Sequence, residues 1–432
     1  MKKLLSVVLA LLMLAVMLPV TAMAETPLPN AQDGVITLEN NVTLSATYTI
    51  PAGVNKIDLN GHEITADSGV STAFMVSNNA NVTICNGSIK VENEVFRVNG
   101  NAALTLNADL TVTSQTDCCV FIYGAGATLN TSARLESSSS QYATILGNGN
   151  ESSWGTTINV TGGSVKSNNW FAIYHPQVGK LNISGNAEIV GSQTGIEIRA
   201  GELMVSGNPS IEGNGTYNVA ANGSGETIKG AAIAVSQHTT KQPITVTIMG
   251  GSLSGAAAIS EANPQNNDVA DTANVKINVT GGEFRGDITK SKDNSTIVIT
   301  GGTFYRNIEE IKKYIPEGSE LVNDGNDGFT VRAKSTTIII TPAEDTPKTE
   351  PEKNPTTGAN DMVAVAAALM AVSALGISRT VFHLQVVSHI ALDDRHTHLH
   401  TEAEHFRNLL ALVCHHLLRN LHCTFIINSI SQ

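Results

Sequence analysis

The chain has 432 residues, of which 41% are hydrophobic, only 4% are aromatic and 15% are charged. Soluble domains usually carry about 25% charged residues, so uncharged polar residues and 37 glycines must supply much of this surface. The net charge of −12, without any basic run, excludes the basic face that duplex nucleic acid requires, so we expect no nucleic-acid partner. Nineteen aromatic residues are few for this length, which favours an elongated β architecture filled by Val, Ile, Leu and Ala.

The five cysteines are too few and too scattered to form a disulfide scaffold. Cys118 and Cys119 are adjacent, and neighbours on a strand point to opposite faces, so we do not expect them to bond each other. Cys85 lies within an alternating strand pattern, which predicts a small buried apolar residue.

Residues 1–24, MKKLLSVVLALLMLAVMLPVTAMA, have the pattern of a secretory signal peptide. Lys2 and Lys3 form its positive region, an apolar run follows, and residues 22–24 supply an A-x-A cleavage site. An uncleaved membrane anchor is the alternative, although the small residues are well placed for cleavage. Cleavage would remove two lysines, leave a net charge of −14 and start the mature chain near Glu25, so we expect an exported protein.

Residues 25–333 repeat imperfectly, at intervals of about 20 to 30 residues. Each unit has a short alternating apolar strand, a Gly-Gly or Gly-Asn turn, and a second short strand. Gly-Gly pairs occupy the same place in four units, at residues 162–163, 250–251, 281–282 and 301–302. The clearest units are TTINVTGGSVKS (156–167), KLNISGNAEIVGS (180–192), ELMVSGNPSIEGN (202–214), VTIMGGSLSG (246–255), VKINVTGGEFRG (275–286) and TIVITGGTFYRN (296–307).

A fixed repeat of strand, turn and strand without an intervening helix predicts a stacked solenoid. The predicted fold class is all-β: a single right-handed parallel β-helix of the pectate-lyase-like kind, with coils of roughly 22 residues spaced about 4.8 Å apart. Around ten coils would result, with Val, Ile and Leu ladders inside. A β-sandwich chain with hairpin turns is the alternative, but hairpins would not repeat the same Gly-Gly offset at this interval.

The segment after the last repeat, residues 305–332, has the pattern of a cap that covers the open coil. Ile308, Ile311 and Ile315 lie at helical spacing, and Pro316 ends that turn. A small hairpin is expected to follow. A GGTF repeat followed by a Pro-Glu-Gly turn and a Gly-rich hairpin resembles the ending of repeat-containing surface proteins of Gram-positive gut bacteria.

The next two segments predict a linker and an anchoring signal. Residues 334–353 are rich in Pro and charge, which predicts an extended linker. Residues 354–379 contain the pentapeptide NPTTG and an apolar stretch that ends before Arg379. The pentapeptide consists of Asn354, Pro355, Thr356, Thr357 and Gly358.

This order resembles a sortase cell-wall sorting signal of the LPXTG-like type, in an NPXTG variant. The resemblance implies that a sortase joins Thr357 to peptidoglycan and releases Gly358, while the apolar segment retains the chain briefly in the membrane. It therefore implies an extracellular location on the cell wall of a Gram-positive bacterium.

Residues 380–432 differ from everything before them and depart from the sorting-signal pattern, which normally ends with a small Lys/Arg cluster. Nine of the twelve histidines lie here, and His396, His398 and His400 are weak candidates for a zinc site. A shifted reading frame or run-on translation is the simpler interpretation of this tail.

Catalysis on a β-helix is the rival functional reading, because such folds often host polysaccharide lyases and hydrolases. Hydrolysis needs two carboxylates that face one sugar bond. No repeat brings two acids together by spacing, although acids on successive coils could still meet. The isolated acids of the repeats include Asp58, Asp109, Asp117, Glu197 and Asp287.

The remaining candidates are histidines and aromatic residues. His62, His175 and His238 are solitary, which favours turn or surface positions over catalysis. Trp154, Trp170, Phe171 and Tyr174 form the richest aromatic region and are the candidate ligand patch, with core filling as the alternative. Together these features predict a non-catalytic binding or adhesion module for glycans or host surface ligands, without a cofactor. A surface polysaccharide lyase or glycoside hydrolase is the alternative.

Overall fold

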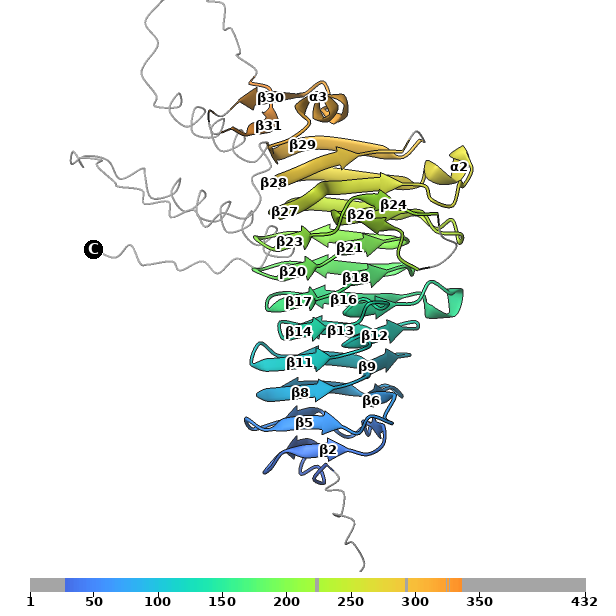
Figure 1. The fold of residues 1–432 in the computed structure, drawn as a ribbon, viewed down its shortest axis with the longest axis vertical. Coiled ribbons are helices and arrows are strands. Elements are labelled where there is room, and N and C mark those ends of the chain that lie inside the picture. Colours follow the sequence, from blue (N-terminus) through green and yellow to red (C-terminus); the bar gives the residue numbers. More distant parts are fainter. Residues whose placement is uncertain (1–27, 222–224, 292–293, 324, 326, 336–432) are drawn as a thin grey trace, which may run out of the picture. The chain divides into compact units, whose positions relative to one another are not determined.

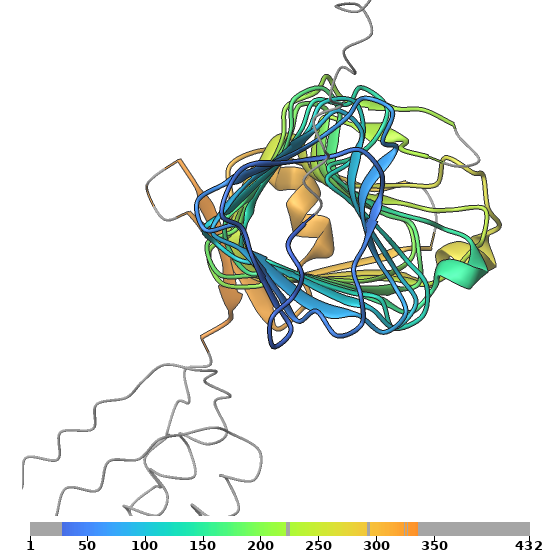
Figure 2. The same cartoon turned by 90° about the horizontal axis from the view of Figure 1, so that it is seen from below.

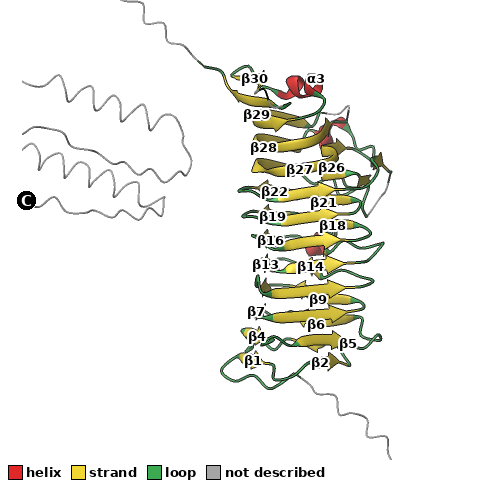
Figure 3. Ribbon diagram, turned by 60° about the vertical axis from the view of Figure 1, so that its left-hand side comes forward, coloured by secondary structure: helices red, strands yellow, loops and turns green. Residues whose placement is uncertain are grey.

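The computed structural model describes residues 28–335, apart from 222–224, 292–293, 324 and 326. These residues form a right-handed parallel β-solenoid of about 11 turns. The coils stack along one axis, and helices are few and short (Figures 1 and 3). Each strand that stacks on the next coil pairs with it in parallel, for example β10 with β13 and β13 with β16. The predicted solenoid is therefore confirmed, and the alternative of a sandwich is wrong.

Three faces, each made of one strand from every coil, enclose the interior. The first face consists of β1 (Val35–Thr37), β4 (Lys56–Asp58), β7 (Asn81–Cys85), β10 (Ala103–Leu106), β13 (Thr128–Thr131), β16 (Thr156–Val160), β19 (Gly179–Ile183) and β22 (Gly201–Val205). The long strands β27 (Ile244–Ala262), β28 (Val275–Thr289) and β29 (Thr296–Phe304) continue this face and turn the corner into the second. β27 and β28 also extend into the third face, where β27 pairs with β26.

The second face follows the glycine turns. It consists of β2 (Val42–Leu44), β5 (Glu63–Ala66), β8 (Gly87–Val91), β11 (Leu110–Ser114), β14 (Arg134–Ser137), β17 (Ser164–Ser167), β20 (Glu188–Gly191) and β23 (Ser210–Gly213). The third face consists of β3 (Tyr48–Thr49), β6 (Thr72–Val76), β9 (Glu94–Asn99), β12 (Val120–Tyr123), β15 (Ile145–Gly147), β18 (Phe171–His175), β21 (Thr194–Ile198) and β26 (Ala231–Ser236).

The elements outside the three faces lie at corners and at the end of the solenoid. They are η1 (Glu151–Ser153), the hairpin of β24 (Asn218–Val219) and β25 (Ile228–Lys229), α2 (Val269–Thr272), α3 (Ile308–Ile311), η2 (Lys312–Tyr314), β30 (Ser319–Asn323) and β31 (Phe329–Ala333). Both η1 and α2 lie at the corner between the third and first faces, and they project from the same side of the solenoid (Figure 2).

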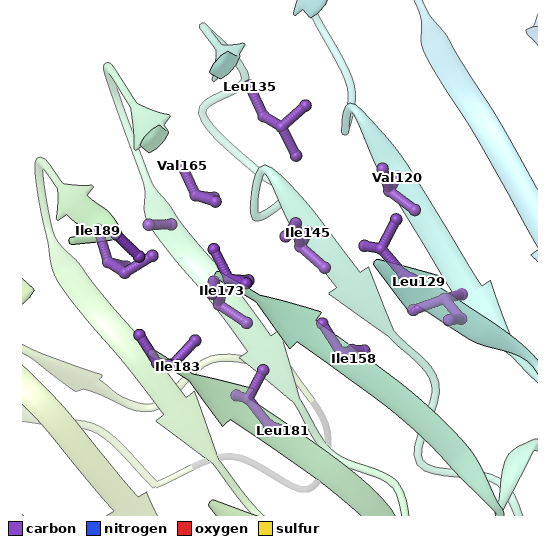
Figure 4. Close-up of a cluster of buried hydrophobic side chains, with 14 of the residues drawn as sticks. Val120, Leu129, Leu135, Ile145, Ile158, Val165, Ile173, Leu181, Ile183 and Ile189 are labelled. Atoms are coloured by element: carbon purple, nitrogen blue, oxygen red, sulfur yellow. The ribbon is translucent and has the colours of Figure 1, made fainter. Parts of the chain in front are cut away.

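The interior is built from apolar ladders that run from coil to coil (Figure 4). Alternation along each strand places every second side chain inside, and the parallel register puts it over its equivalent in the neighbouring coil. The fully buried ladders include Leu129–Ile158–Leu181 from the first face, Leu135–Val165–Ile189 from the second and Val120–Ile145–Ile173 from the third. This is the ladder arrangement that the sequence predicts.

Glycines form the corner between the first and second faces, as predicted. The second glycine of each pair has a positive φ, +64° at Gly163, +88° at Gly251 and +105° at Gly282. Side chains other than Asn and Asp rarely adopt this conformation, which explains why the pairs recur at this corner.

The corner between the second and third faces requires small residues for a different reason. Ser114, Ser137 and Ser167 stack in register there, followed by Gly191 and Gly213. The serine hydroxyls bind backbone groups within the bend; that of Ser137, for example, donates to the Asp117 carbonyl at 2.6 Å. At Gly191 the chain bends so tightly that a Cβ would lie 1.7 Å from the carbonyl oxygen of Thr194.

Replacing Gly191 with Ala should therefore lower the free energy of unfolding by about 3 kcal/mol, because the backbone has to move to accept the methyl group. Urea titration followed by circular dichroism measures this change. Gly69→Ala is the matched control, since no atom lies within 4 Å of a Cβ there and its φ is not positive. Equal effects of the two substitutions would contradict the steric explanation.

The C-terminal coil is covered by the predicted cap. Ile311 on α3 is fully buried in the main core, and Ile308 and Ile315 pack against it. Viewed along the axis, this helix lies over the interior of the solenoid (Figure 2). The β30–β31 hairpin is antiparallel and adds to the last coil through β29.

Cys85, Cys118 and Cys119 are free and buried. Cys119 belongs to the interior core, whereas Cys118 is buried outside that cluster, so the adjacent thiols do not bond each other. These three cysteines behave as the sequence predicts.

His175 overturns an expectation, because it lies in the interior and not at a turn or on the surface. It continues an inward row between Gly147 and Ile198, it is fully buried, and neither ring nitrogen has a hydrogen-bond partner. Burial lowers the pKa of His175 to about 4, because the charged imidazolium would lose its hydration.

The folded protein should consequently lose stability in acid. The pKa in the unfolded chain is about 6.5, so the neutral His175 favours folding fully above pH 6.5, and this contribution is lost as the pH falls towards 4. The loss amounts to up to about 3 kcal/mol for this residue. His175→Leu should make the unfolding free energy depend less steeply on pH between 6.5 and 4, while the part contributed by His238, whose pKa is also lowered to about 4, should remain. An unaltered slope in His175→Leu would contradict the assignment.

Candidate functional site

The outer side of the third face carries aromatic and charged side chains in successive coils. Register pairs place Met75, Arg97, Phe121, Leu146 and Tyr174 one above the other, and Glu197 follows Tyr174. Each coil advances this column by about 4.8 Å. The side chains of this column from Met75 to Leu146 are half-exposed, whereas Tyr174 and Glu197 are buried.

The half-exposed part forms what we call the aromatic row, which consists of Arg97, Phe121, Tyr123, Leu146, Trp170 and Lys229. Phe121 and Tyr123 point outward from the same strand because they are two residues apart, and their ring centroids are 5.0 Å apart. The guanidinium carbon of Arg97 lies 5.4 Å from the centre of the Phe121 ring. Beside them, the Asn99 amide donates to the hydroxyl of Tyr123 at 3.0 Å.

Trp170 and Lys229 form the other end of this row. Leu146 and Trp170 pack against a small cluster made of Ala143, Phe171 and Tyr174, which connects Trp170 to the Phe121 end. The ammonium of Lys229 lies 4.6 Å from the centre of the Trp170 ring. The row therefore has a cation against an aromatic face at each end.

A buried carboxylate fixes Arg97 in place. The Nε and Nη2 atoms of Arg97 donate to the two oxygens of Glu94, at 2.8 and 2.7 Å, and the Thr72 hydroxyl also donates to Glu94. Burial raises the pKa of Glu94, although the bidentate contact with Arg97 favours its ionised form. Such a pair holds the planar guanidinium at a fixed angle over the neighbouring ring.

The remaining part of the third face is covered by the described residues of an insertion, 214–221 and 225–230, which connects β23 to β26. The carboxylate of Glu197 accepts hydrogen bonds from the backbone and hydroxyl of Thr227 and from the backbone of Ile228. Arg199 donates to the carbonyls of Gly225 and Gln237, and its Nε lies 3.9 Å from Glu197. Both side chains are fully buried, so a desolvated ion pair holds the insertion to the face.

A second carboxyl group of the insertion lies close to this pair. Burial raises the pKa of Glu226 to about 7, and the charge of Glu197 contributes to the shift. Its Oε1 atom and the indole nitrogen of Trp170 are both buried, and an interaction with the Trp170 side chain opposes the rise in the pKa of Glu226. Glu197 and Glu226, which belong to different coils, are thus neighbours here. The spacing of acids within one repeat does not reveal this proximity.

The structure divides the predicted patch of Trp154, Trp170, Phe171 and Tyr174. Phe171 is fully buried and Tyr174 is 5% exposed, so neither presents a ring face to solvent. Trp170 remains half-exposed at the start of β18. Trp154 follows η1 at the far corner, where its indole donates to the carbonyl of Gly149. Only Trp170 of the four lies in the aromatic row.

His238 also differs from the expectation of a surface position, since it is only 8% exposed. Its Nδ1 atom lies 3.0 Å from the hydroxyl of Thr240. Burial lowers the pKa of His238 to about 4, and the charge of Arg199 acts in the same direction. The neutral form of His238 is therefore favoured at pH 7.

Two further groups of acids have structural explanations. Asn86 connects Asp58 and Asp109 across three coils, because its side-chain amide donates to Asp58 and its backbone donates to Asp109, each at 3.0 Å. In the other group, ligand atoms of Glu94, Asp117 and Cys118 lie within 4.8 Å of one another. Glu94 is already paired with Arg97, and burial raises the pKa of Cys118 well above its usual value, which disfavours the thiolate that a metal would need.

The sorting pentapeptide, Asn354, Pro355, Thr356, Thr357 and Gly358, lies outside the described residues. His396, His398 and His400 also lie outside them, as do the signal peptide and residues 336–353 of the predicted linker. In the part of the chain that the structure describes, no helix has the length and apolar character needed to cross a bilayer.

Comparison of the chain with protein-family models, with curated proteins and with solved structures found no match.

Sequence reasoning missed Arg97, Phe121, Tyr123 and Lys229. The signal for two of them was present, because the strand VFIY (120–123) has aromatic residues at the two positions opposite its inward Val and Ile. The contact of Arg97 with Phe121 depends on the register between coils, and irregular coil lengths hide that register in the sequence.

Proposed function

We propose that this protein is exported, joined to the cell wall of a Gram-positive bacterium, and acts there as a non-catalytic module that binds glycans through the aromatic row. The signal-peptide and sorting-signal patterns of the sequence support export and attachment. The aromatic row supports glycan binding and is the observation that carries the proposal.

Half-exposed aromatic rings next to fixed polar groups suit sugars, because rings bury the C–H face of a pyranose while the polar groups bind its hydroxyls. Phe121 and Tyr123 supply the rings, and Asn99 supplies an amide held by the Tyr123 hydroxyl. These groups stand on rigid strands of the solenoid, so binding orders few side chains and costs little conformational entropy.

The rival proposal of a polysaccharide hydrolase or lyase would need accessible acids. Two pairs of carboxyl groups on this side of the solenoid come into question. Carboxylate oxygens of Glu94 and Asp117 lie within 4.8 Å of each other, but Arg97 already holds both oxygens of Glu94. The other pair is Glu197 with Glu226, and a pKa of about 7 for Glu226 is compatible with a general acid. Glu197, however, is fully buried, and four hydrogen bonds from Thr227 and Ile228 occupy its oxygens. This arrangement favours an anchoring role for Glu197, and hence the binding proposal.

Replacing Phe121 with Ala should weaken binding to the best ligand of a glycan array by about 30-fold, because an aromatic contact of this kind contributes about 2 kcal/mol. Tyr305→Ala is the matched control, since Tyr305 also lies against an arginine, with 4.0 Å between the Arg285 guanidinium carbon and the ring centre, but outside the aromatic row.

The purified unmodified protein should release no new reducing ends or unsaturated products from the polysaccharide that it binds. Sustained release that disappears in Glu226→Gln would refute the binding-only proposal. Binding to a host protein with no glycan bound at all would refute the proposed ligand class.

Attachment is tested separately at the sorting pentapeptide. Thr357→Ala should release the protein into the culture medium, because the carbonyl of Thr357 is the group that a sortase would attack. Immunoblots of wall and medium fractions measure the distribution, and circular dichroism should show an intact solenoid. An unchanged amount on the wall would mean that the proposed attachment is wrong.

A further inference from the structure

We infer that the aromatic row selects glycans that carry carboxylate groups, with Arg97 and Lys229 as the residues that recognise them. This inference rests on the proposed function and adds the chemical class of the ligand.

One nitrogen of the Arg97 guanidinium is left without a hydrogen bond among the described residues. Its Nε and Nη2 atoms are taken by Glu94, but its Nη1 atom has no partner among the described residues. The side chain is 36% exposed and lies against Phe121. A guanidinium that is fixed on one side and free on the other can donate to a carboxylate without first losing rotamer freedom.

Lys229 supplies a charge that no described carboxylate neutralises. Its ammonium lies over Trp170, and among the described residues it forms no ion pair. Because β25 belongs to the hairpin of the insertion, the contacts of Glu197 with Thr227 and Ile228 hold the backbone immediately before Lys229.

The two cations lie in different coils. Three coil steps lead from Arg97 through Phe121 and Leu146 to Tyr174, which corresponds to about 14 Å along the solenoid axis. Trp170, the contact of Lys229, precedes Tyr174 by four residues, so Lys229 is displaced sideways from this column. A glycan that covers Phe121 and Leu146 would therefore cross the third face obliquely to reach both cations.

The net positive charge of the row comes from Lys229. Arg97 and Glu94 compensate each other, so this pair offers a guanidinium donor but no net charge. A carboxylate oxygen of Asp117 lies within 4.8 Å of one of Glu94. Burial raises the pKa of Glu226 to about 7, which reduces its negative charge near neutral pH.

The test compares alginate, a polymer of uronic acids, with carboxyl-reduced alginate, which keeps the sugar backbone but lacks the charge. The unmodified protein should bind alginate at least about tenfold more tightly than the reduced polymer, and added salt should diminish that ratio. Lys229→Gln should lower the ratio several-fold, because the ratio compares the two polymers within one variant and so cancels any loss of binding that they share.

Arg97 is tested as the double variant Glu94→Gln with Arg97→Gln, so that no buried carboxylate loses its partner. It should also lower the ratio, and combined with Lys229→Gln it should bring the ratio close to one. The matched control is Lys180→Gln with Lys276→Gln, which removes two exposed charges from the first face and should leave the ratio unchanged. Circular dichroism verifies the fold of each variant.

The outcomes separate this inference from the proposed function. Equal binding of both polymers by the unmodified protein, lost in Phe121→Ala, would overturn the inference and keep the glycan-binding proposal. A ratio that persists without Arg97 and Lys229 would also overturn it. Failure to bind either polymer or any other glycan of the array would overturn both.

Discussion

The parallel register between successive coils is the constraint on which the whole structure depends. Every inward side chain has to fit directly over its equivalent one coil earlier, as Ile158 does between Leu129 and Leu181. This requirement fixes which residues point inward, and therefore which point outward, along each strand. It also constrains the corners, where glycine and serine recur because they let the chain turn without displacing the next strand.

The same constraint explains where the coils differ in length. Additional residues can enter a coil only at a corner, because an insertion within a strand would reverse all side chains after it. The 214–230 insertion enters between the second and third faces, and folds back over outward residues that the register has already placed. Its attachment through Glu197 and Arg199 buries a charged pair on a face that would otherwise be exposed to solvent. The insertion thereby divides the third face into a covered part and an open part.

The sequence predicts the fold well because solenoid geometry is local. Repeated strand–Gly-Gly–strand units specify the ladders and the first corner, and Ile311 with its neighbours specifies the cap. The inward position of His175 was also available from alternation, since it follows the inward Ile173 by two residues. The candidate site was harder to predict from the sequence. Tyr174 is covered by a segment that lies some fifty residues later in the chain, and Arg97 contacts Phe121 only through a register that unequal coil lengths obscure.

The hydrogen bonds between coils run roughly along the axis of the solenoid, and this direction has a mechanical consequence. A pull on the two ends would load each junction between coils in series, with the three strands of that junction sharing the force. The shortest strands lie in the first coil, where β1 and β2 have three residues each and β3 has two. Under tension the solenoid should therefore peel from its N-terminal coil, while the longer ladders of β27 and β28 near the C-terminal end stay intact.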